Sequence, residues 1–453
     1  MMTLSAAATI LDAPLKGEDS VFTSVSTDTR NLQPDALFVA LQGPSFDGHK
    51  FLSVAEEKGA VGAVISEPQL TSLTTIRVSN TRKSLGQLAA GWRKQCPVPL
   101  VAVTGSNGKT TVKEMIAAIL GQESRVLATQ GNLNNDIGMP LTLLRLQDEQ
   151  FAVLEMGANH PGEIAYLSRI AQPDVAVITN AGAAHLEGFG DLDGVARAKG
   201  EILSGLVAGG IAVLNADDPR LPVWRELATG NSVLTFGLSP TADVSTDPAA
   251  VATEWTETGF SSSFTVQSRV GQFRVDLALA GQHNLRNALA AIAACQALGI
   301  GVAEIQQGLA QLTPVPGRLQ CRIAVSGLRV IDDSYNANPD SVVAAVEVLR
   351  SAPGKRFLVM GDLAELGKDA AALHFEVGQR AAEAGIDALW ATGNMSREAV
   401  DGFGQGGRYF ADHETLIADL QKTLTVNDTV LVKGSRSAGM ERVVGSLLQA
   451  GED

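Results

Sequence analysis

A glycine-rich loop between an apolar run and a helical pattern constrains this chain more than any other segment. Residues 104–111 read Thr-Gly-Ser-Asn-Gly-Lys-Thr-Thr; they follow the apolar residues 100–103 and precede the helical pattern of 112–120. A strand, a glycine turn and a helix start together aim backbone N–H groups and the positive helix end at one anion. The sequence therefore predicts a polyphosphate site, in which Lys109 adds a mobile charge and the Thr110 hydroxyl suits Mg²⁺.

This loop is a shortened form of the usual phosphate loop. Only Ser106 and Asn107 separate Gly105 from Gly108, whereas the common pattern has four residues between its glycines. The alternative is a glycine turn before a surface helix, but Gly-Lys-Thr-Thr after four residues of buried type rarely arises from packing alone. We therefore expect phosphates to contact Gly105, Ser106, Asn107, Gly108, Lys109, Thr110 and Thr111.

The composition fits a soluble α/β enzyme of several domains. The chain has 453 residues, of which 45% are apolar and 19% charged. At roughly 150 residues per domain, about three domains are expected. The net charge of −14 argues against general attraction to nucleic acid or to an anionic membrane. A phosphate site must therefore concentrate its cations locally, as the glycine-rich loop does.

The cysteines and the N-terminus bear on the cellular compartment. Cys96, Cys295 and Cys321 lie far apart, without a Cys-x-x-Cys pair, which disfavours disulfides and structural zinc and predicts reduced, buried thiols. The N-terminus has no basic lead-in, and no uninterrupted apolar run of about 18 residues is present. We therefore expect a cytoplasmic protein without membrane insertion.

The order of elements predicts three α/β domains. Residues 1–82 mix short strand-like runs, at 36–41 and 62–65, with polar turns and predict a small α/β domain. Residues 83–313 alternate strand-like and helical segments, the signature of a parallel sheet with crossover helices. Alternating apolar positions in 259–280 predict antiparallel strands added at its edge. The other expected elements are strands at 100–103, 151–155, 174–179 and 210–214 and a helix at 285–298.

A third domain, residues 314–453, is expected to be Rossmann-like. The segment Pro314-Val315-Pro316-Gly317 is a natural hinge, because two fixed φ angles and a glycine end the preceding helix. The expected strands are 329–331, 356–360, 388–391 and 429–432, with helical segments between them.

Polar residues follow two strands of the expected central sheet. Glu155 ends a strand and emerges at the carboxyl edge that carries the glycine-rich loop, where a carboxylate suits Mg²⁺. Its alternative is an acid at the N-terminus of a helix that starts near Pro161. His185 lies a few residues beyond the next strand and is either a functional or a structural histidine. Lys199, at the start of an expected apolar helix, is a solvated surface charge from chemistry alone.

Four further residues are candidates for contacts with a nucleotide. Asn284 and Asn287 lie one helical turn apart, so their amides can read a base edge, although Asn284 equally suits a helix N-cap. Arg318, just after the hinge, could neutralise phosphate or be a surface charge. Asp333 follows a strand and could accept from ribose hydroxyls, or form an Asx turn before the helix at Pro339.

Together these segments resemble the Mur ligase family, the ATP-dependent amide ligases that build the peptidoglycan stem peptide. The resemblance runs nearly end to end and rests on the glycine-rich loop, Glu155, His185, Lys199, 283–287, Arg318 and Asp333. In the first domain it rests on Ser26-Thr27-Asp28-Thr29-Arg30 and Phe46-Asp47-Gly48-His49. It implies that the first domain binds the UDP-muramoyl substrate through Ser26, Asp28, Thr29, Arg30, Asp47, Gly48 and His49.

Further segments resemble the family members that join D-alanyl-D-alanine to UDP-N-acetylmuramoyl-tripeptide. They are 131–135, with Asn134 and Asn135 as expected substrate contacts, and 138–141, 155–158 and 361–367. The Asp-Asn-Pro-Arg motif typical of the ligase that adds the third stem residue is absent, which disfavours that alternative. Folylpolyglutamate synthetases share the short loop, but the first-domain segments here look like a UDP-muramoyl-binding domain.

The resemblance changes the interpretation of Lys199, because the matching lysine of the family is carbamylated by CO₂. A carbamate, unlike an ammonium, can ligate a metal, so Lys199 and His185 would position one Mg²⁺. Thr110 and Glu155 would hold a second Mg²⁺ between the terminal phosphates of ATP.

The remaining roles concern ATP and the dipeptide. Lys109 and Arg318 would stabilise the transferring phosphoryl group. The nucleoside would contact Asn284, Asn287 and Asp333. The dipeptide would contact Asn336, Asn338, Lys433, Ser435 and Arg436, although Lys433 could equally be solvated.

Two other functional classes fit the glycine-rich loop taken alone. A phosphate-loop kinase or hydrolase would move phosphate to a hydroxyl or to water, and a nucleotide-gated binding module would carry out no chemistry. Three metal-type groups on one sheet edge exceed what binding requires, so we expect an ATP-dependent ligase, acting as a monomer. The proton acceptor for the attacking amine stays open between His185 and a carboxylate.

Overall fold

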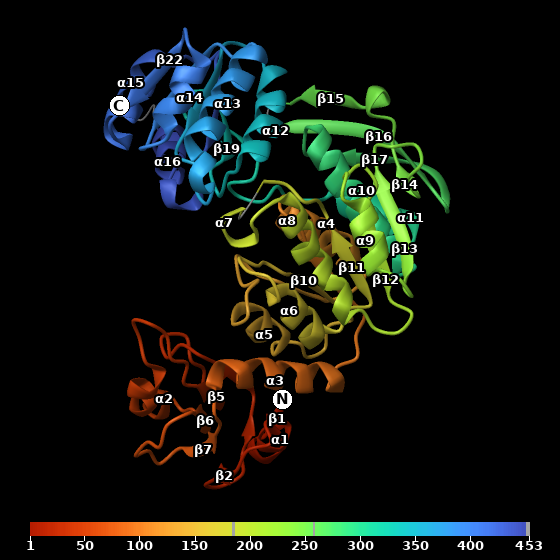
Figure 1. Ribbon diagram of the computed structural model, residues 1–453, viewed down its shortest axis with the longest axis vertical. Helices are drawn as coiled ribbons and strands as arrows, with labels where there is room; N and C mark the ends of the chain where they lie inside the picture. Colours follow the sequence, from red (N-terminus) through yellow and green to blue (C-terminus); the bar gives the residue numbers. More distant parts are fainter. Residues whose placement is uncertain (184–185, 257–258, 450–453) are drawn as a thin grey trace.

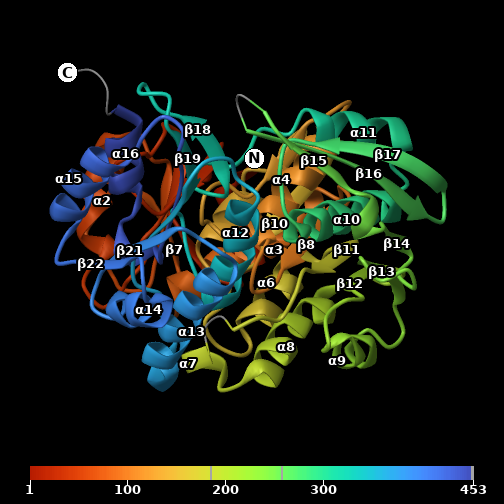
Figure 2. The ribbon, with the colours of Figure 1, turned by 90° about the horizontal axis from the view of Figure 1, so that it is seen from above.

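Three large β-sheets, each covered by helices, follow one another along the described part of the chain (Figure 1). The computed structural model describes residues 1–183, 186–256 and 259–449. The N-terminal and C-terminal sheets lie on the same side of the middle sheet, so that the molecule resembles a C (Figures 1 and 2). This confirms the expected three-part α/β architecture. Within the described part of the chain, no helix combines the length and apolar character needed to cross a membrane.

A five-stranded sheet forms the core of the N-terminal part. One face packs against α1 (Leu4–Ile10) and the other against α2 (Leu52–Glu57). The expected runs at 36–41 and 62–65 become β5 and β6. The sheet order is β2 (Leu15–Lys16), β7 (Thr74–Arg77), β6 (Gly62–Ile65), β5 (Ala36–Val39) and β4 (Ser24–Ser26), beside the separate pair β1 (Met2–Thr3) and β3 (Val21–Phe22).

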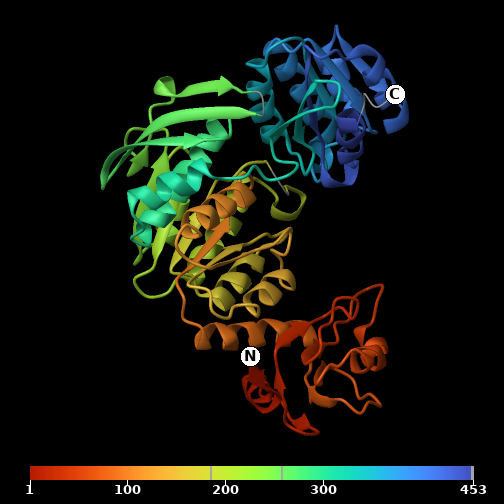
Figure 3. The same cartoon turned by 180° about the vertical axis from the view of Figure 1, so that it is seen from behind.

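A long helix, α3 (Thr81–Gln95), joins this part to the middle one (Figure 3). Its buried side chains include Leu85 and Leu88, and Trp92 donates from Nε1 to the carbonyl oxygen of Leu146 (2.8 Å). The predicted boundary at residue 82 therefore falls in the first turn of a helix that packs against both the N-terminal part and the middle part. The exact division stays a prediction.

The middle sheet has ten strands, and its central strands are parallel. All the expected strands are present, including the antiparallel pair β16 and β17 at one edge. The strands β9, β13, β14 and β15 were not expected; in β13, Thr235 interrupts the apolar run. The sheet order is β15 (Ala252–Trp255), β16 (Phe260–Ser268), β14 (Val244–Ser245), β13 (Ser232–Gly237), β12 (Ile211–Asn215), β11 (Val175–Ile178), β8 (Leu100–Thr104), β10 (Phe151–Glu155) and β9 (Val126–Ala128), with β17 (Gly271–Leu277) paired to β16.

Helices cover both faces of the middle sheet. Successive residues of a strand point to opposite faces, and in the central strands the residues on both faces are apolar. In β8, Val101 and Val103 pack with α4, α10 and α11, whereas Leu100 and Ala102 belong to the core on the other face. The helices are α4 (Lys109–Leu120), α5 (Gly138–Leu143), α6 (Glu163–Ala171), α7 (Leu186–Phe189), α8 (Leu192–Gly200), α9 (Leu221–Leu227), α10 (Gln282–Ala297) and α11 (Val302–Ala310).

The C-terminal part is a six-stranded sheet in which all pairs but β18–β19 are parallel. The four expected strands are confirmed, and β18 and β22 join them at the edges. The sheet order is β18 (Gln320–Ile323), β19 (Arg329–Asp333), β23 (Thr429–Lys433), β20 (Arg356–Met360), β21 (Ala388–Thr392) and β22 (Gly407–Phe410). Its helices are α12 (Pro339–Arg350), α13 (Ala370–Glu383), α14 (Ser396–Phe403), α15 (His413–Thr423) and α16 (Glu441–Gln449).

The three cysteines are free thiols, as expected. Cys295 and Cys321 are buried, and burial raises the pKa of the Cys321 thiol to about 11. Cys96 is only half-buried, because it caps the end of α3, so the expectation of a buried thiol is wrong there.

Candidate functional site

The glycine-rich loop connects β8 to α4 at the carboxyl edge of the middle sheet. Gly108 is the N-cap of α4 with φ of +81°, a conformation that favours glycine. The ammonium of Lys109 folds back over the loop and donates to the carbonyl oxygens of Gly105 (2.7 Å) and Ser106 (3.2 Å). Desolvation lowers the pKa of Lys109, while Glu155 opposes that shift and Arg318 adds to it. A cation is thus held at the start of a helix, where an anion would bind.

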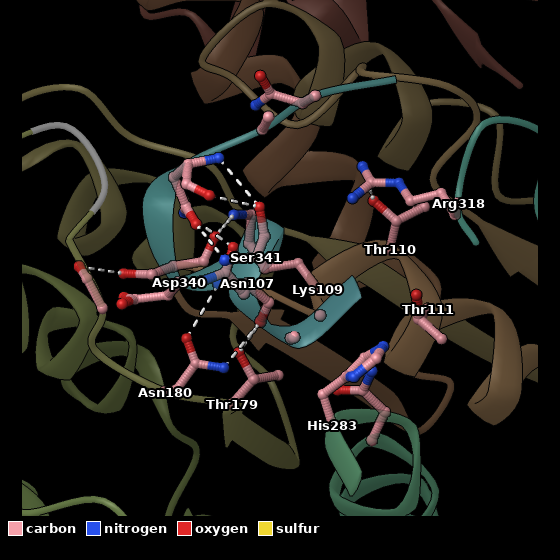
Figure 4. Close-up of a pocket in the computed structure, with 18 of the residues that line it drawn as sticks. Asn107, Lys109, Thr110, Thr111, Thr179, Asn180, His283, Arg318, Asp340 and Ser341 are labelled. Atoms are coloured by element: carbon pink, nitrogen blue, oxygen red, sulfur yellow. Dashed lines mark hydrogen bonds between the residues drawn. The ribbon is translucent and has the colours of Figure 1, made fainter. Parts of the chain in front are cut away.

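Two side chains beyond the adjacent strand β11 hold this loop in place (Figure 4). The Asn107 N–H donates to Oδ1 of Asn180 (3.0 Å), and the Asn107 carbonyl accepts from Asn180 Nδ2 (3.1 Å) and Thr179 Oγ1 (2.6 Å). Neither residue was predicted from the sequence as part of the site. Their polar character directly after a buried strand, at the same sheet edge as the loop, was the available signal.

A Cβ at Gly108 would overlap Oδ1 of Asn287, whereas Gly209, with φ of +80°, has nothing within 4 Å. Both Gly108→Ala and Gly209→Ala are expected to lower the free energy of unfolding by about 1 kcal/mol, because L residues are strained at positive φ. Only Gly108→Ala should also weaken ADP binding, by about tenfold or more, the equivalent of about 1.4 kcal/mol. Urea unfolding and calorimetric titration with ADP measure the two effects, and equal ADP affinities would contradict the prediction.

Glu155 lies at the end of β10, beside the first turn of α4. Its Oε2 accepts from Thr110 Oγ1 (2.8 Å), and its Oε1 accepts from Asn134 Nδ2 (2.8 Å). The alternative of a helix N-terminal acid is wrong, because Glu163 and Glu201 accept from the backbone N–H groups near the start of α6.

The pair of Glu155 and Thr110 fits Mg²⁺. Glu155 is buried, its carboxylate has neutral hydrogen-bond donors in place of an ion pair, and a hydroxyl oxygen lies beside it. Mg²⁺ prefers one or two such hard oxygens and takes its other ligands from phosphates and water. In the described part of the chain, no group of three His, Cys, Asp or Glu side chains is placed to hold a metal by itself. The structure thus fits a metal that arrives with a nucleotide.

Lys199 is buried, so the expectation of a solvated charge is wrong for this residue. It lies in the last turn of α8 with 1% exposure, and its Nζ is 5.2 Å from the centroid of the Phe189 ring. Burial lowers the pKa of Lys199 to about 7; the nearby Lys109 also lowers it, while Glu201 and Glu163 oppose the shift. A large fraction of this amine is therefore neutral near pH 7. The expected partner His185 lies outside the described residues.

Asn284 and Asn287 line the same cavity as the glycine-rich loop. The N-cap of α10 is Gly281, so the alternative that Asn284 caps the helix is wrong. Asn284 donates from Nδ2 to the Ala280 carbonyl (2.9 Å) and accepts from Asn287 Nδ2 (3.1 Å), which fixes both amides. Their contact with a base stays a prediction. Beside them, burial lowers the pKa of His283 to about 4, so this imidazole is neutral.

Arg318 reaches across from the C-terminal part to the glycine-rich loop. It donates from Nη2 to Thr110 Oγ1 (3.1 Å), and it is half-buried, so the alternative of a surface charge is wrong. Asp333 forms an ion pair with Lys433 (2.6 Å), which is 2% exposed; the alternative of a solvated Lys433 is therefore wrong as well. Asp333 forms no Asx turn, because its Oδ1 accepts from the Leu319 N–H and its Oδ2 from Lys433 Nζ.

The residues expected to contact the dipeptide line the same cavity of about 810 Å³ as the phosphate loop. They are Asn336, Asn338, Lys433, Ser435 and Arg436. Asn338 donates from Nδ2 to Oδ1 of Asn107 (2.8 Å), and Asp340 accepts from the backbone N–H of Ala183 (3.0 Å). The C-terminal part therefore contacts the middle part directly over the loop. Other residues of this lining were not predicted from the sequence. They include Asp217, Asp218, Phe236, Arg286, Asp340 and Ser341.

The expected UDP-muramoyl contacts lie in the N-terminal part and do not line this cavity. Asp28 pairs with the exposed Arg30 (2.6 Å), beside Ser26 and Thr29. Asp47 binds Nδ1 of the buried His49 (2.7 Å), next to Gly48. Asn135 Oδ1 accepts from the Gly138 N–H (2.8 Å) at the start of α5, so of the two expected asparagines only Asn134 reaches Glu155. Binding of substrate by these residues stays a prediction.

The fold and this site define a phosphate-loop enzyme whose nucleotide cavity lies between two α/β domains. Residues 103–295 match the Mur ligase middle domain, residues 317–436 the Mur ligase, glutamate ligase domain, and residues 21–98 the Mur ligase family, catalytic domain. The chain belongs to the Mur ligase family, which confirms the resemblance.

Several relatives and solved structures match nearly the whole chain. The chain is 46% identical to the UDP-N-acetylmuramoyl-tripeptide--D-alanyl-D-alanine ligase of Escherichia coli (strain K12), over 99% of each chain. It is 35% identical to MurF from Acinetobacter baumannii, with a TM-score of 0.91 and coverage of 99% and 98%. The MurF ligase of Thermotoga maritima in complex with ADP is 31% identical, with a TM-score of 0.84 and coverage of 94% and 97%.

Proposed function

We propose that this chain is an ATP-dependent amide ligase of peptidoglycan precursor synthesis that joins D-alanyl-D-alanine to UDP-N-acetylmuramoyl-tripeptide. The observation that carries the proposal is the meeting of two domains on one hydroxyl: Thr110, in the phosphate loop, binds both Glu155 and Arg318. A relative with that activity in its name is 46% identical over the full length, and a MurF structure similar to this chain holds ADP. The products are the amide, ADP and phosphate, and the role is in cell-wall biogenesis, and hence in cell shape and division.

The first step is attack of the stem-peptide carboxylate on the γ-phosphate of ATP, which gives an acyl phosphate and ADP. Two anions must approach, so cations have to offset their repulsion. Lys109, held over the phosphate loop, and Arg318, which donates to Thr110, supply this positive charge. The N-terminus of α4 adds backbone N–H groups toward the phosphates.

The second step is attack of the D-alanyl-D-alanine amine on the acyl phosphate, followed by collapse to the amide and phosphate. The acyl phosphate must be protected from water meanwhile. The contacts of Asn338 with Asn107 and of Asp340 with Ala183 show how the C-terminal part can cover the loop. Such alignment of reactants is worth up to roughly 7–11 kcal/mol in well-oriented systems. His185 or a carboxylate takes the amine proton.

Mg²⁺ and a carbamate on Lys199 complete the proposed site. Glu155 and Thr110 would hold one Mg²⁺ ion, and carbamylated Lys199 with His185 would position a second. Bound Mg²⁺ supplies Lewis-acid neutralisation of phosphate charge. The buried, partly neutral amine of Lys199 supports the carbamate, because only a neutral amine reacts with CO₂.

The remaining contacts extend the proposal to both substrates. Asn284, Asn287 and Asp333 contact the nucleoside, and the five residues named above contact the dipeptide. The segments around Asp28 and His49 bind the UDP-muramoyl part, on the same side of the middle sheet as the C-terminal part (Figure 1). We also propose that the protein acts as a monomer in the cytoplasm.

Phosphate release from ATP with UDP-N-acetylmuramoyl-tripeptide, with and without D-alanyl-D-alanine, tests the proposal. We expect release to depend on the dipeptide and mass spectrometry to find one amide per phosphate. Release without the amine would indicate a hydrolase, and a phosphorylated product a kinase. Nucleotide binding without turnover would indicate a binding module. Turnover with UDP-N-acetylmuramoyl-dipeptide and a diamino acid would indicate the ligase that adds the third residue.

A further inference from the structure

One aromatic ring contacts two of the arginines that line the cavity. The Cζ atom of Arg318 lies 4.4 Å from the centroid of the Tyr335 ring, and the Cζ atom of Arg436 lies 5.6 Å from it. In the described part of the chain both arginines belong to the cavity lining and Tyr335 does not. The ring therefore lies behind the arginines rather than in the cavity.

The backbone fixes the ring beside the hinge segment. The Tyr335 N–H donates to the carbonyl oxygen of Gly317 (3.1 Å), and the Leu319 N–H donates to Asp333 Oδ1 (3.0 Å). Gly317 has φ of +71°, and a Cβ there would lie 3.1 Å from Tyr335 Cβ, so the two segments approach closely. Both chain neighbours of Arg318, Gly317 and Leu319, therefore form hydrogen bonds with residues at the end of β19 or just after it.

A stacked ring can orient a guanidinium without consuming its hydrogen-bond donors. The attraction acts through the faces of the ring and the guanidinium, while the N–H groups stay free in the guanidinium plane. Arg318 uses Nη2 on Thr110, and its buried Nε has no hydrogen-bond partner among the described residues. A carboxylate in place of the ring would occupy these donors and neutralise the charge. The stack instead presents a charged arginine with a spare donor beside the phosphate loop.

We propose that Tyr335 is a positioning residue for phosphoryl transfer, which holds Arg318 in the plane from which its N–H groups reach the transferring phosphate. The inference rests on the proposed function. Arg436, over the same ring at the longer distance, adds a second cation to this edge of the cavity. Since Tyr335 acts through Arg318, its loss should affect the transition state more than substrate binding.

The test compares Tyr335→Leu and Tyr335→Phe by phosphate release at saturating substrates. We expect Tyr335→Leu to lower kcat about tenfold, which corresponds to about 1.4 kcal/mol, with KM for ATP changed less than about threefold. Tyr335→Phe keeps the ring and should stay within about twofold of the unmodified protein. In an Arg318→Ala background, Tyr335→Leu should have no further effect, because a residue that acts through another loses its effect with it.

Tyr409→Leu is the matched control, because Arg397 Cζ lies 4.5 Å from the Tyr409 ring in the same domain but outside the cavity lining. Its kcat should not change. If Tyr335→Leu does not fold, fluorinated phenylalanines at position 335 keep the shape and weaken the π face stepwise, and kcat should fall with each fluorine.

A kcat of Tyr335→Leu equal to that of the unmodified protein, or an equal loss in the Arg318→Ala background, would overturn the inference. So would a fluorinated series without a trend. Amide formation by the unmodified protein is scored separately, so that failure of the proposed function is distinguished from failure of the stack. The ratio of phosphate release between two variants measures the effect of the Tyr335 ring whether the protein acts as a ligase or as a hydrolase.

Discussion

Replacement of Lys109 by methionine is expected to lower kcat about 10³-fold, the largest loss we expect from a single residue of the phosphate loop. The Lys109 ammonium lies against the carbonyl oxygens of Gly105 and Ser106, and its pKa responds to both Glu155 and Arg318. It is therefore close to the Glu155 carboxylate and to the Arg318 guanidinium. Methionine keeps the length of the side chain but removes the charge that offsets the repulsion between the two reacting anions.

The matched control is Lys113→Met, one turn further along α4. Lys113 is buried too, but its ammonium donates to the Thr129 carbonyl (2.7 Å) and lies outside the cavity lining. This variant should lose stability, measured by urea unfolding, with kcat within about tenfold of the unmodified protein. Equal losses of kcat in the two variants would contradict the prediction. They would mean that both buried lysines of α4 have a structural role.

The sheet-edge rule made the centre of the site predictable from the sequence. Thr110 follows β8 and Glu155 ends β10, and these two strands are adjacent and parallel. Their carboxyl ends therefore had to meet, and the two side chains lie 2.8 Å apart. Continuous apolar runs marked both strands, because strands buried on both faces have no polar alternation.

Other features depend on packing between distant segments and could not be predicted. Lys199 is buried because α8 packs against α9 and Phe189, which no local pattern reveals. Lys433 is buried because β23 lies beside β19 and brings it to Asp333. The strand β13 was missed because Thr235, in the middle of its run, is satisfied by Asp243.

The approach of Arg318 to Thr110 has a different origin. The prolines and the glycine of 314–317 predict a hinge, but a hinge does not specify the angle at which the next domain docks. That angle is fixed by contacts such as Asn338 with Asn107 and Asp340 with Ala183. The sequence therefore predicted many of the residues that line the cavity, but it did not predict how the two domains meet over the phosphate loop.

Lys199→Ala is expected to lower kcat by about 100-fold or more, and small carboxylic acids such as formate or acetate should restore part of the loss. The substitution would remove both oxygens of the proposed carbamate and leave a buried space at the end of α8, next to Lys109, for a small carboxylate. The added carboxylate would replace the missing oxygens without being attached to the chain. Phosphate release is measured against formate concentration, with sodium chloride of equal ionic strength as the control. Full activity of the untreated variant would remove the carbamate from the mechanism, since a carbamate has no other attachment point at this position.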